Sequence, residues 1–286
     1  MEKRIKIAVQ KSGRLYEGTI KLLTECGLSI SNGHNRLVDR PTNFPIDLLY
    51  LRDDDIPKYV EDKIADIGIV GENVVYEKNK TVNIIRKLGF AKCRLSIAIP
   101  KTEVYTGLDF LSGKKIATSY SKIVSDFLKE KGINADIHEI SGSVEIAPAI
   151  NLADVIIDLV STGSTLIGNG LKEVETILNS EAVIISNPLL DENEMSIVNK
   201  LLFRIEAVSK SKKYRYLLLN APESSVNEII NLVPGMKSPT IMPLAKSGWC
   251  SMHSVVEEDK FWDVIDNLKL LGAEGILIIP IEKMIL

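Results

Sequence analysis

The chain has 286 residues, 45% of them hydrophobic, and carries a formal net charge of −3. This length suffices for two domains or three small ones, and the mild acidity gives no reason to expect nucleic acid or an anionic membrane as a partner. No stretch approaches the ~20 apolar residues of a membrane helix, and the N-terminus has no apolar signal core. We therefore expect a cytoplasmic protein.

Predicted strands and helices alternate over the first 210 residues, which indicates an α/β fold with a mainly parallel sheet in each of two lobes. We assign residues 1–90 with 181–210 to the first lobe and residues 91–180 to the second. Strands are predicted over 5–10, 46–51, 96–99, 137–140 and 182–185, and others begin at residues 64, 115 and 153. Helices are predicted over 15–26, 123–131, 143–151 and 192–208, and another begins at Pro57 with Asp55 as its cap.

Basic and small residues follow several of these strands. Lys11 and Arg14 lie between the first strand and its helix, where the helix end favours an anion. Arg52 follows the second strand, although the acids beside it could equally neutralise it. Gly71 ends the strand that begins at residue 64. Because ligands bind beyond the carboxyl ends of such strands, we expect a cleft between the lobes to gather these residues with the loop at Ser161.

The stretch from Ala153 to Leu166 carries the most informative pattern. A short apolar strand with Asp154 and Asp158 breaks into a loop of hydroxyl residues and one glycine, namely Ser161, Thr162, Gly163, Ser164 and Thr165. The backbone N–H groups and hydroxyls of such a loop can bind a phosphate. The two acids can accept hydrogen bonds from sugar hydroxyls or hold a metal ion carried by a pyrophosphate. We interpret the pattern as a site for a phosphorylated ribose; the alternative is an ordinary turn capped by Asp158.

The element order changes in residues 211–286. Strands and helices follow the order β-α-β-β-α-β, which is typical of a ferredoxin-like domain. Residues 210–213 are either a linker or the charged end of the preceding helix. The last predicted helix, 258–271, is amphipathic, with one apolar face formed by Phe261, Val264, Ile265, Leu268 and Leu271. A domain of this kind often binds an effector or another subunit, and the alternative is a purely structural extension.

Six segments together resemble the long form of the ATP phosphoribosyltransferases, and the resemblance covers essentially the whole chain. They are residues 10–15 (QKSGRL), 52–57 (RDDDIP), 65–73 (ADIGIVGEN), 154–166 (DVIIDLVSTGSTL), 234–240 (PGMKSPT) and 279–284 (IPIEKM). One departure is Asn151, where the family pattern usually has Gly. The resemblance implies two lobes similar to type II periplasmic binding proteins, followed by a C-terminal ferredoxin-like (βαββαβ) regulatory domain at residues 211–286.

The resemblance also implies a reaction. The 5-phosphoribosyl group of phosphoribosyl pyrophosphate is transferred to N1 of ATP with Mg²⁺, giving 1-(5-phosphoribosyl)-ATP and pyrophosphate in the first step of histidine biosynthesis. It further implies feedback inhibition by histidine and a homo-oligomer, from dimer to hexamer. The competing hypotheses are a non-catalytic two-lobed solute-binding protein and a phosphoribosyltransferase for another base. Transferases of the second kind usually have adjacent acids before the phosphate loop, whereas three residues separate Asp154 from Asp158.

Adenine N1 carries a free lone pair, so alignment and charge stabilisation should matter more than a general base. The expected catalytic residues are Asp154, Asp158, Arg14 and Lys11. The expected substrate contacts are Ser161, Thr162, Gly163, Ser164, Thr165, Arg52, Gly71 and Glu145. Mg²⁺ is expected at Asp154 and Asp158, directly or through the substrate, and histidine at Ser238, Thr240 and Ser254. We expect Asp158→Asn to lower turnover far more than thermal stability.

Overall fold

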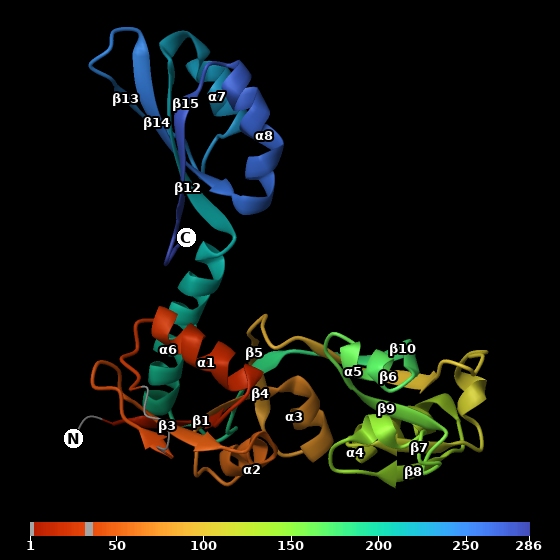
Figure 1. Ribbon diagram of the computed structural model, residues 1–286. Coiled ribbons are helices and arrows are strands. Elements are labelled where there is room, and N and C mark those ends of the chain that lie inside the picture. The colour runs from red at the N-terminus through yellow and green to blue at the C-terminus, as the bar shows by residue number, and fades with distance from the viewer. Residues whose placement is uncertain (1–2, 32–36) are drawn as a thin grey trace. The chain divides into compact units, whose positions relative to one another are not determined.

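The computed structural model describes residues 3–31 and 37–286. It divides into two compact units. The first comprises Met1–Lys21 and Leu28–Ile197, and the second comprises Leu22–Gly27 and Val198–Leu286. The first unit contains two sheets and the second contains one (Figure 1).

Lobe I is built on a six-stranded sheet with the order β2-β3-β1-β4-β11-β5. At its centre, β1 (Ile5–Gln10) pairs in parallel with β3 (Ile46–Leu51) and β4 (Ile67–Gly71). The remaining strands run antiparallel to their neighbours; they are β2 (Val38–Asp39), β5 (Asn83–Lys87) and β11 (Ala182–Ser186). The helices that follow the three parallel strands are α1 (Arg14–Glu25), α2 (Ile56–Glu61) and α3 (Glu72–Lys78). Apolar residues of α2 and α3 pack with β1, β4 and β11 in one buried cluster.

Lobe II is built on a five-stranded sheet with the order β10-β6-β9-β7-β8. Here β7 (Lys115–Thr118) pairs in parallel with β8 (Asp136–Glu139) and β9 (Val155–Val160). Two antiparallel strands complete it, β6 (Cys93–Pro100) and β10 (Leu171–Ser180). The helices of this lobe are α4 (Ser121–Lys131) and the short α5 (Ser164–Gly168).

The expectation of mainly parallel sheets is therefore wrong, because both sheets are mixed. Three of the antiparallel strands, β2, β5 and β10, were not predicted. In β10 the sequence LKEVETILNS holds six polar residues among ten, and its burial pattern is mostly intermediate. Such an edge strand lacks the continuous apolar run by which the central strands are recognised.

Two local predictions near the expected site are also wrong. Residues 143–151 form a 3-10 helix over Val144–Ile146 and then turns rather than an α-helix. Pro148 brings no N–H to a helical ladder, and Ser143 and Asn151 have positive φ angles of 52° and 59°. Asn is among the residues that best tolerate this region, which explains how it replaces the Gly of the resemblance. Asp55 likewise ends a 3-10 turn and its side chain makes no capping hydrogen bond.

The second unit contains a four-stranded antiparallel sheet with the order β13-β14-β12-β15. Its elements are β12 (Tyr214–Pro222), α7 (Val226–Leu232), β13 (Thr240–Pro243), β14 (Trp249–Glu257), α8 (Glu258–Leu270) and β15 (Glu274–Pro280). This confirms the ferredoxin-like domain. Leu217, Leu219 and Met252 pack against Phe261 and Leu268 of α8 in its core. The preceding helix α6 (Glu192–Ser211) continues through residue 211, so residues 210–213 begin as a charged helix end.

Candidate active site

A pocket of about 200 Å³ lies at the carboxyl end of β9, where the chain turns into α5. Figure 1 labels both elements. Gly163 adopts a φ of +80° at this turn, in the left-handed region that favours glycine. The hydroxyl residues beside it are exposed, and Thr162 Oγ1 lies 3.0 Å from Ser164 Oγ. The pocket is lined by Arg14, Ser96, Ala98, Glu145, Ile156, Asp158, Leu159, Val160, Ser161, Thr162, Gly163, Ser164, Thr165 and Leu166. The structure thus brings together the whole predicted loop with Asp158, Glu145 and Arg14.

Arg14 reaches this pocket from lobe I. It is the first residue of α1, directly after the turn that follows β1. Its Nη1 donates a hydrogen bond of 2.7 Å to Ser161 Oγ. An exposed guanidinium with further N–H donors therefore stands at the mouth of a loop rich in hydroxyls, which is a favourable arrangement for a phosphate group.

Asp158 lies on β9 opposite Ser96 of β6. Burial raises the pKa of this carboxyl to about 6, and the charge of Glu145 acts in the same direction. The backbone N–H groups of Leu159 and Ser119 partly counter this by lowering the pKa. Asp158 is thus a carboxylate with few partners of its own at the edge of a pocket, which is a common setting for a group that meets a ligand.

Asp154 is not part of this pocket. It precedes β9, and its Oδ2 accepts a 2.9 Å hydrogen bond from the backbone N–H of Lys115. A strand advances about 3.3 Å per residue, so the four residue steps from Asp154 to Asp158 correspond to about 13 Å. The structure therefore places Asp158 in the lining of the pocket and Asp154 outside it: even spacing puts both on one face, but Asp154 precedes the strand and Asp158 lies nearer its carboxyl end.

Lys11, Arg52 and Gly71 lie together at the carboxyl edge of the lobe I sheet but do not line the pocket. The Lys11 N–H donates to the carbonyl of Leu51 at 2.9 Å, so Lys11 and Arg52 follow a pair of neighbouring strands. Both side chains are exposed. Gly71 ends β4, and a Cβ atom there would lie 2.5 Å from Asn73 Oδ1.

Residues that the sequence reasoning did not single out surround Asp158 and the loop. Tyr120 follows β7, and its pKa is raised by burial and then by the charges of Asp158 and Asp53. It accepts a 3.2 Å hydrogen bond from Asn73 Nδ2. Tyr120 could have been found by the same rule as Arg14, because it stands in a loop beyond the carboxyl end of a predicted parallel strand.

Arg94 contacts the backbone of the loop at Ser161. Its guanidinium makes two hydrogen bonds to the Glu173 carboxylate, which hold the pKa of Glu173 below its usual range. Arg94 Nη1 also donates to the carbonyl oxygen of Ser161 at 3.4 Å. Glu173 lies on β10, which was not predicted, so no local pattern pointed to this pair.

The predicted effector residues lie in the second unit. Ser238 and Thr240 are exposed, in the segment that leads into and begins β13. Ser254 is buried, and its hydroxyl donates to the carbonyl of Val233 at 3.1 Å. Ser254 therefore fixes the start of the loop that carries Ser238.

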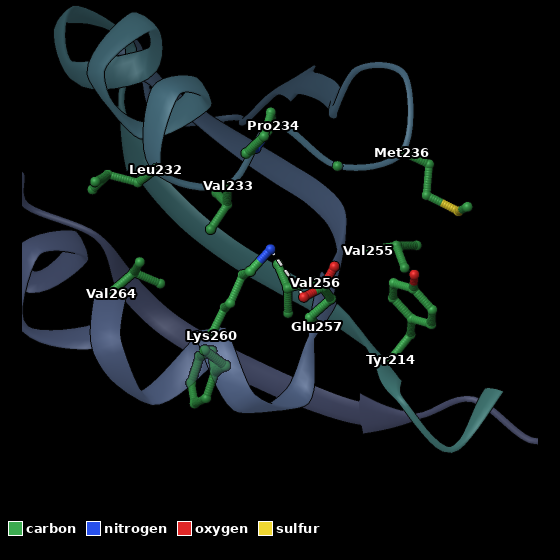
Figure 2. A pocket seen from close by; sticks show the side chains of 12 residues that line it. Tyr214, Leu232, Val233, Pro234, Met236, Val255, Val256, Glu257, Lys260 and Val264 are labelled. Atoms are coloured by element: carbon green, nitrogen blue, oxygen red, sulfur yellow. Dashed lines mark ion pairs between the residues drawn. The ribbon is translucent and has the colours of Figure 1, made fainter. Parts of the chain in front are cut away.

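A separate cavity of about 310 Å³ lies in the same unit, between the residues after α7 and the first turns of α8 (Figure 2). Leu232, Val233 and Val264 give it apolar walls. Lys260 Nζ and the Glu257 carboxylate form an ion pair of 2.9 Å across it. Because these two charges neutralise each other, the cavity offers no unpaired group for a charged ligand.

Within residues 3–31 and 37–286, no group of three or more His, Cys, Asp or Glu side chains is placed to hold a metal ion. No helix in that part of the chain is long and apolar enough to cross a membrane. The acids available at the pocket are Asp158 and Glu145. This donor set suits Mg²⁺ only if phosphate oxygens of a substrate supply further ligands.

Comparison with known proteins gives a consistent picture over the whole length. A family model described as ATP phosphoribosyltransferase matches residues 52–207, and one described as HisG, C-terminal domain, matches residues 211–283. The ATP phosphoribosyltransferase of Cytophaga hutchinsonii is 54% identical over 281 residues, which cover 98% of this chain and 98% of that protein. The ATP phosphoribosyltransferase of Phocaeicola vulgatus is 55% identical over 282 residues, covering 99% of this chain and 100% of that protein.

Two solved structures resemble the fold. A chain of the ATP phosphoribosyl transferase (HisG:HisZ) complex from Thermotoga maritima aligns with a TM-score of 0.60 and 28% identity, over 71% of this chain and 98% of that chain. A histidine kinase sensor domain with similarity to periplasmic binding proteins aligns with a TM-score of 0.51 and 10% identity, over 74% of this chain and 92% of that chain. At that identity the second likeness concerns the fold alone, and it agrees with the expected two-lobed architecture.

Proposed function

The chain belongs to the ATP phosphoribosyltransferase family, and we propose that the pocket at the end of β9 is where it holds the ribose 5-phosphate of its donor substrate. Enzymes of this family join phosphoribosyl pyrophosphate to N1 of ATP in the first step of histidine biosynthesis. The observation that carries the proposal is the pocket itself, which combines the exposed hydroxyl loop, the Asp158 carboxylate and the Arg14 guanidinium. This activity replaces the hypothesis of a non-catalytic solute-binding protein.

Each group of the pocket suits one part of the substrate. Ser161, Thr162, Ser164 and Thr165, with the backbone of Gly163, bind the 5-phosphate. Asp158 accepts hydrogen bonds from the ribose hydroxyls, and its negative charge stabilises the positive charge that builds up on the ribose as the bond to pyrophosphate breaks. Glu145 lies beside Asp158 and contributes to the same region. Asp154 is left out of this assignment because it lies at the other end of β9.

The basic residues of lobe I suit the polyphosphate groups. Arg14 bridges to the loop, whereas Lys11 and Arg52 extend from the neighbouring ends of β1 and β3 toward the phosphates of ATP or the leaving pyrophosphate. Gly71 ends the neighbouring strand β4 and has no side chain that would take up space beside these phosphates. The new bond joins adenine N1 to ribose C1 while the bond from C1 to pyrophosphate breaks, so no proton has to be removed from the nucleophile. The work of the protein is alignment and the exclusion of water.

Enzymes of this family generally use a divalent metal ion, and we assign Mg²⁺ to that role here. Asp158 and Glu145 are the carboxylates that would hold it together with oxygens of the pyrophosphate. A divalent ion held there would supply positive charge to offset that of the leaving pyrophosphate. Two acids without a third are consistent with an ion that arrives with the substrate.

We further propose that histidine binds the C-terminal domain and inhibits the enzyme. Ser238 and Thr240 offer exposed hydroxyls on the loop and the edge strand, and Ser254 holds that loop in place. The domain also leaves apolar residues exposed on its sheet, among them Ile241, Met242, Leu277 and Ile279, which supports a homo-oligomer built through it, from dimer to hexamer. We place the enzyme in the cytoplasm.

A pair of matched substitutions tests the phosphate assignment. Ser164→Asp puts a carboxylate at the first residue of α5, a position that accepts an acid structurally but repels a phosphate. Ser112→Asp adds the same charge at an exposed position before β7. By calorimetry, Ser164→Asp should weaken the binding of ribose 5-phosphate by about 10-fold or more, as expected for loss of a charged hydrogen bond. Ser112→Asp should bind it as the unaltered protein does, and equal binding by all three proteins would overturn the assignment.

A further inference from the structure

The N-terminus of α4 is capped by a residue of the other lobe. Tyr120, which precedes α4, makes no side-chain capping hydrogen bond. Instead the Glu77 carboxylate accepts hydrogen bonds from the backbone N–H groups of Lys122 and Ile123, each at 3.0 Å. Glu77 belongs to α3, which follows β4 in lobe I, whereas α4 follows β7 in lobe II. A charged carboxylate on two free N–H groups of a helix start is a strong form of this contact.

A second contact links the same two segments. Asn73, also on α3, donates from Nδ2 to the Tyr120 hydroxyl at 3.2 Å. Asn73 is buried, and its orientation is fixed by Ser180: the Asn73 N–H donates to Ser180 Oγ at 3.0 Å, and Ser180 Oγ donates to Asn73 Oδ1 at 2.8 Å. The two contacts therefore fasten lobe I to residues 120–123 at neighbouring points.

Residues 120–123 continue directly from the segment that contacts Asp158. The backbone N–H of Ser119 donates to the Asp158 carboxylate. The other side of the pocket receives Arg14 from lobe I. Lobe I thus contacts lobe II at two places: Arg14 contacts the phosphate loop, and Glu77 and Asn73 contact residues 120–123, next to Ser119.

We propose that Glu77 and Asn73 act as an interlobe clamp, and that Glu77 is a positioning residue which sets the spacing between the basic groups of lobe I and the ribose site of lobe II. The inference rests on the proposed function of the β9 pocket. Ribose 5-phosphate is held mainly by the loop and Asp158 of lobe II, with Arg14 added from lobe I, so its binding depends on this spacing less than the reaction does, because the reaction needs both lobes in register. A misplacement of about 1 Å between reacting groups can cost up to about 100-fold in rate.

The test uses Glu77→Gln in the full chain. A glutamine has one acceptor oxygen where the carboxylate has two, and its NH₂ group would face a backbone N–H. The matched control is Glu139→Gln. Glu139 also contacts the start of α4, because its carboxylate accepts a 2.7 Å hydrogen bond from the Ser121 hydroxyl. Glu139 lies on β8, however, which belongs to lobe II as α4 does.

We expect Glu77→Gln to lower kcat/KM by about 10-fold, within the range that misalignment can produce, while the dissociation constant of ribose 5-phosphate stays within about two-fold. Glu139→Gln should leave both values unchanged. An unaltered kcat/KM for Glu77→Gln, or an equal loss of ribose 5-phosphate binding, would overturn the clamp. If Glu77→Gln does not fold, Glu77→Asp, which keeps the charge on a shorter side chain, is judged by the same two values. Failure of the unaltered protein to bind ribose 5-phosphate would instead count against the proposed pocket.

Discussion

The Arg14 guanidinium donates a 2.7 Å hydrogen bond to the hydroxyl of Ser161, although 147 residues separate the two in the chain. Arg14 begins the first helix of lobe I, and Ser161 begins the phosphate loop of lobe II. A single side chain therefore places a positive charge from one lobe at the proposed phosphate site of the other. This makes Arg14 the most direct test of whether both lobes serve one site.

We expect Arg14→Met to lower kcat/KM by about 10- to 100-fold, which corresponds to the ~1.5–3 kcal/mol of a hydrogen bond to a charged group. The change keeps the apolar stem and removes the guanidinium. The matched control is Lys21→Met, which removes a positive charge from an exposed position of the same helix. Steady-state rates with ATP, phosphoribosyl pyrophosphate and Mg²⁺ measure the effect. Equal losses in both variants would mean that net charge, rather than the contact with the loop, is responsible.

The ionisation of Asp158 should appear in the pH dependence of the reaction. Burial raises its pKa to about 6, so the carboxylate is ionised at pH 7 and becomes protonated as the pH falls through 6. A protonated Asp158 loses the charge that faces the ribose, and kcat/KM, which reports the free enzyme, should therefore fall below about pH 6. A profile that stays flat between about pH 5 and 8 would argue against a role for the ionised form.

Asp158 should also cost stability at neutral pH. Its pKa in the folded protein is above the ordinary value of 3.8, so its favourable contribution is present below pH 3.8 and is lost as the pH rises toward 6. A shift of about two units sets an upper bound of about 3 kcal/mol. We expect Asp158→Asn to raise the free energy of unfolding at pH 7, because it removes the buried charge. The gain should be about 1–2 kcal/mol rather than the full bound, because Asn replaces one of the accepted hydrogen bonds imperfectly.

Denaturant unfolding of both proteins at pH 7 and near pH 4 measures this difference, which should nearly vanish at the lower pH. Turnover of Asp158→Asn should fall at the same time, so the substitution separates activity from stability. A variant that is less stable at pH 7 and still active would instead support a structural capping role for Asp158.

Asp154 should behave in the opposite way. Its carboxylate lies just before β9 and accepts a hydrogen bond from the backbone N–H of Lys115, and Asp154 is not among the residues that line the pocket. We expect Asp154→Ala to lower the free energy of unfolding by about 0.5–1.5 kcal/mol, the usual value of one hydrogen bond, with kcat/KM within about two-fold. Asp154→Asn, which keeps an acceptor oxygen, should be closer to the unaltered protein in stability. A large loss of activity in both variants would mean that Asp154 does belong to the active site.

The contrast between Asp154 and Asp158 shows how far the sequence could lead. The loop from Ser161 to Thr165 was recognisable because strand, glycine and hydroxyls are local features, and local features survive folding unchanged. The two acids shared a face by their even spacing, but spacing along a strand also separates residues, and the sequence reasoning neglected that distance. The bond between Glu77 and α4, and that between Arg94 and Glu173, join distant segments. They depend on strand order, and on the unpredicted β10, which no local pattern reveals.

The proposed histidine site can be tested without cutting the chain. A truncation near residue 210 would end inside α6, where Met284 N–H donates to the carbonyl of Ala207 and Ser211 Oγ donates to that of Glu282. Thr240→Ala removes one exposed hydroxyl of β13, and Ser247→Ala removes another from the loop between β13 and β14. If Thr240 contacts histidine, its loss should raise the histidine concentration for half-inhibition by about five-fold, as expected for one hydrogen bond of ~1 kcal/mol.

Rates without histidine should be the same in both variants, because neither hydroxyl lies in the unit that holds the β9 pocket. Ser247→Ala should also keep the half-inhibiting concentration of the unaltered protein, since its loop is apart from the residues assigned to the effector. Adding Ser238→Ala to Thr240→Ala should weaken inhibition further, in proportion to a second lost contact. Inhibition that is unchanged in the double variant would place the histidine site elsewhere in the chain.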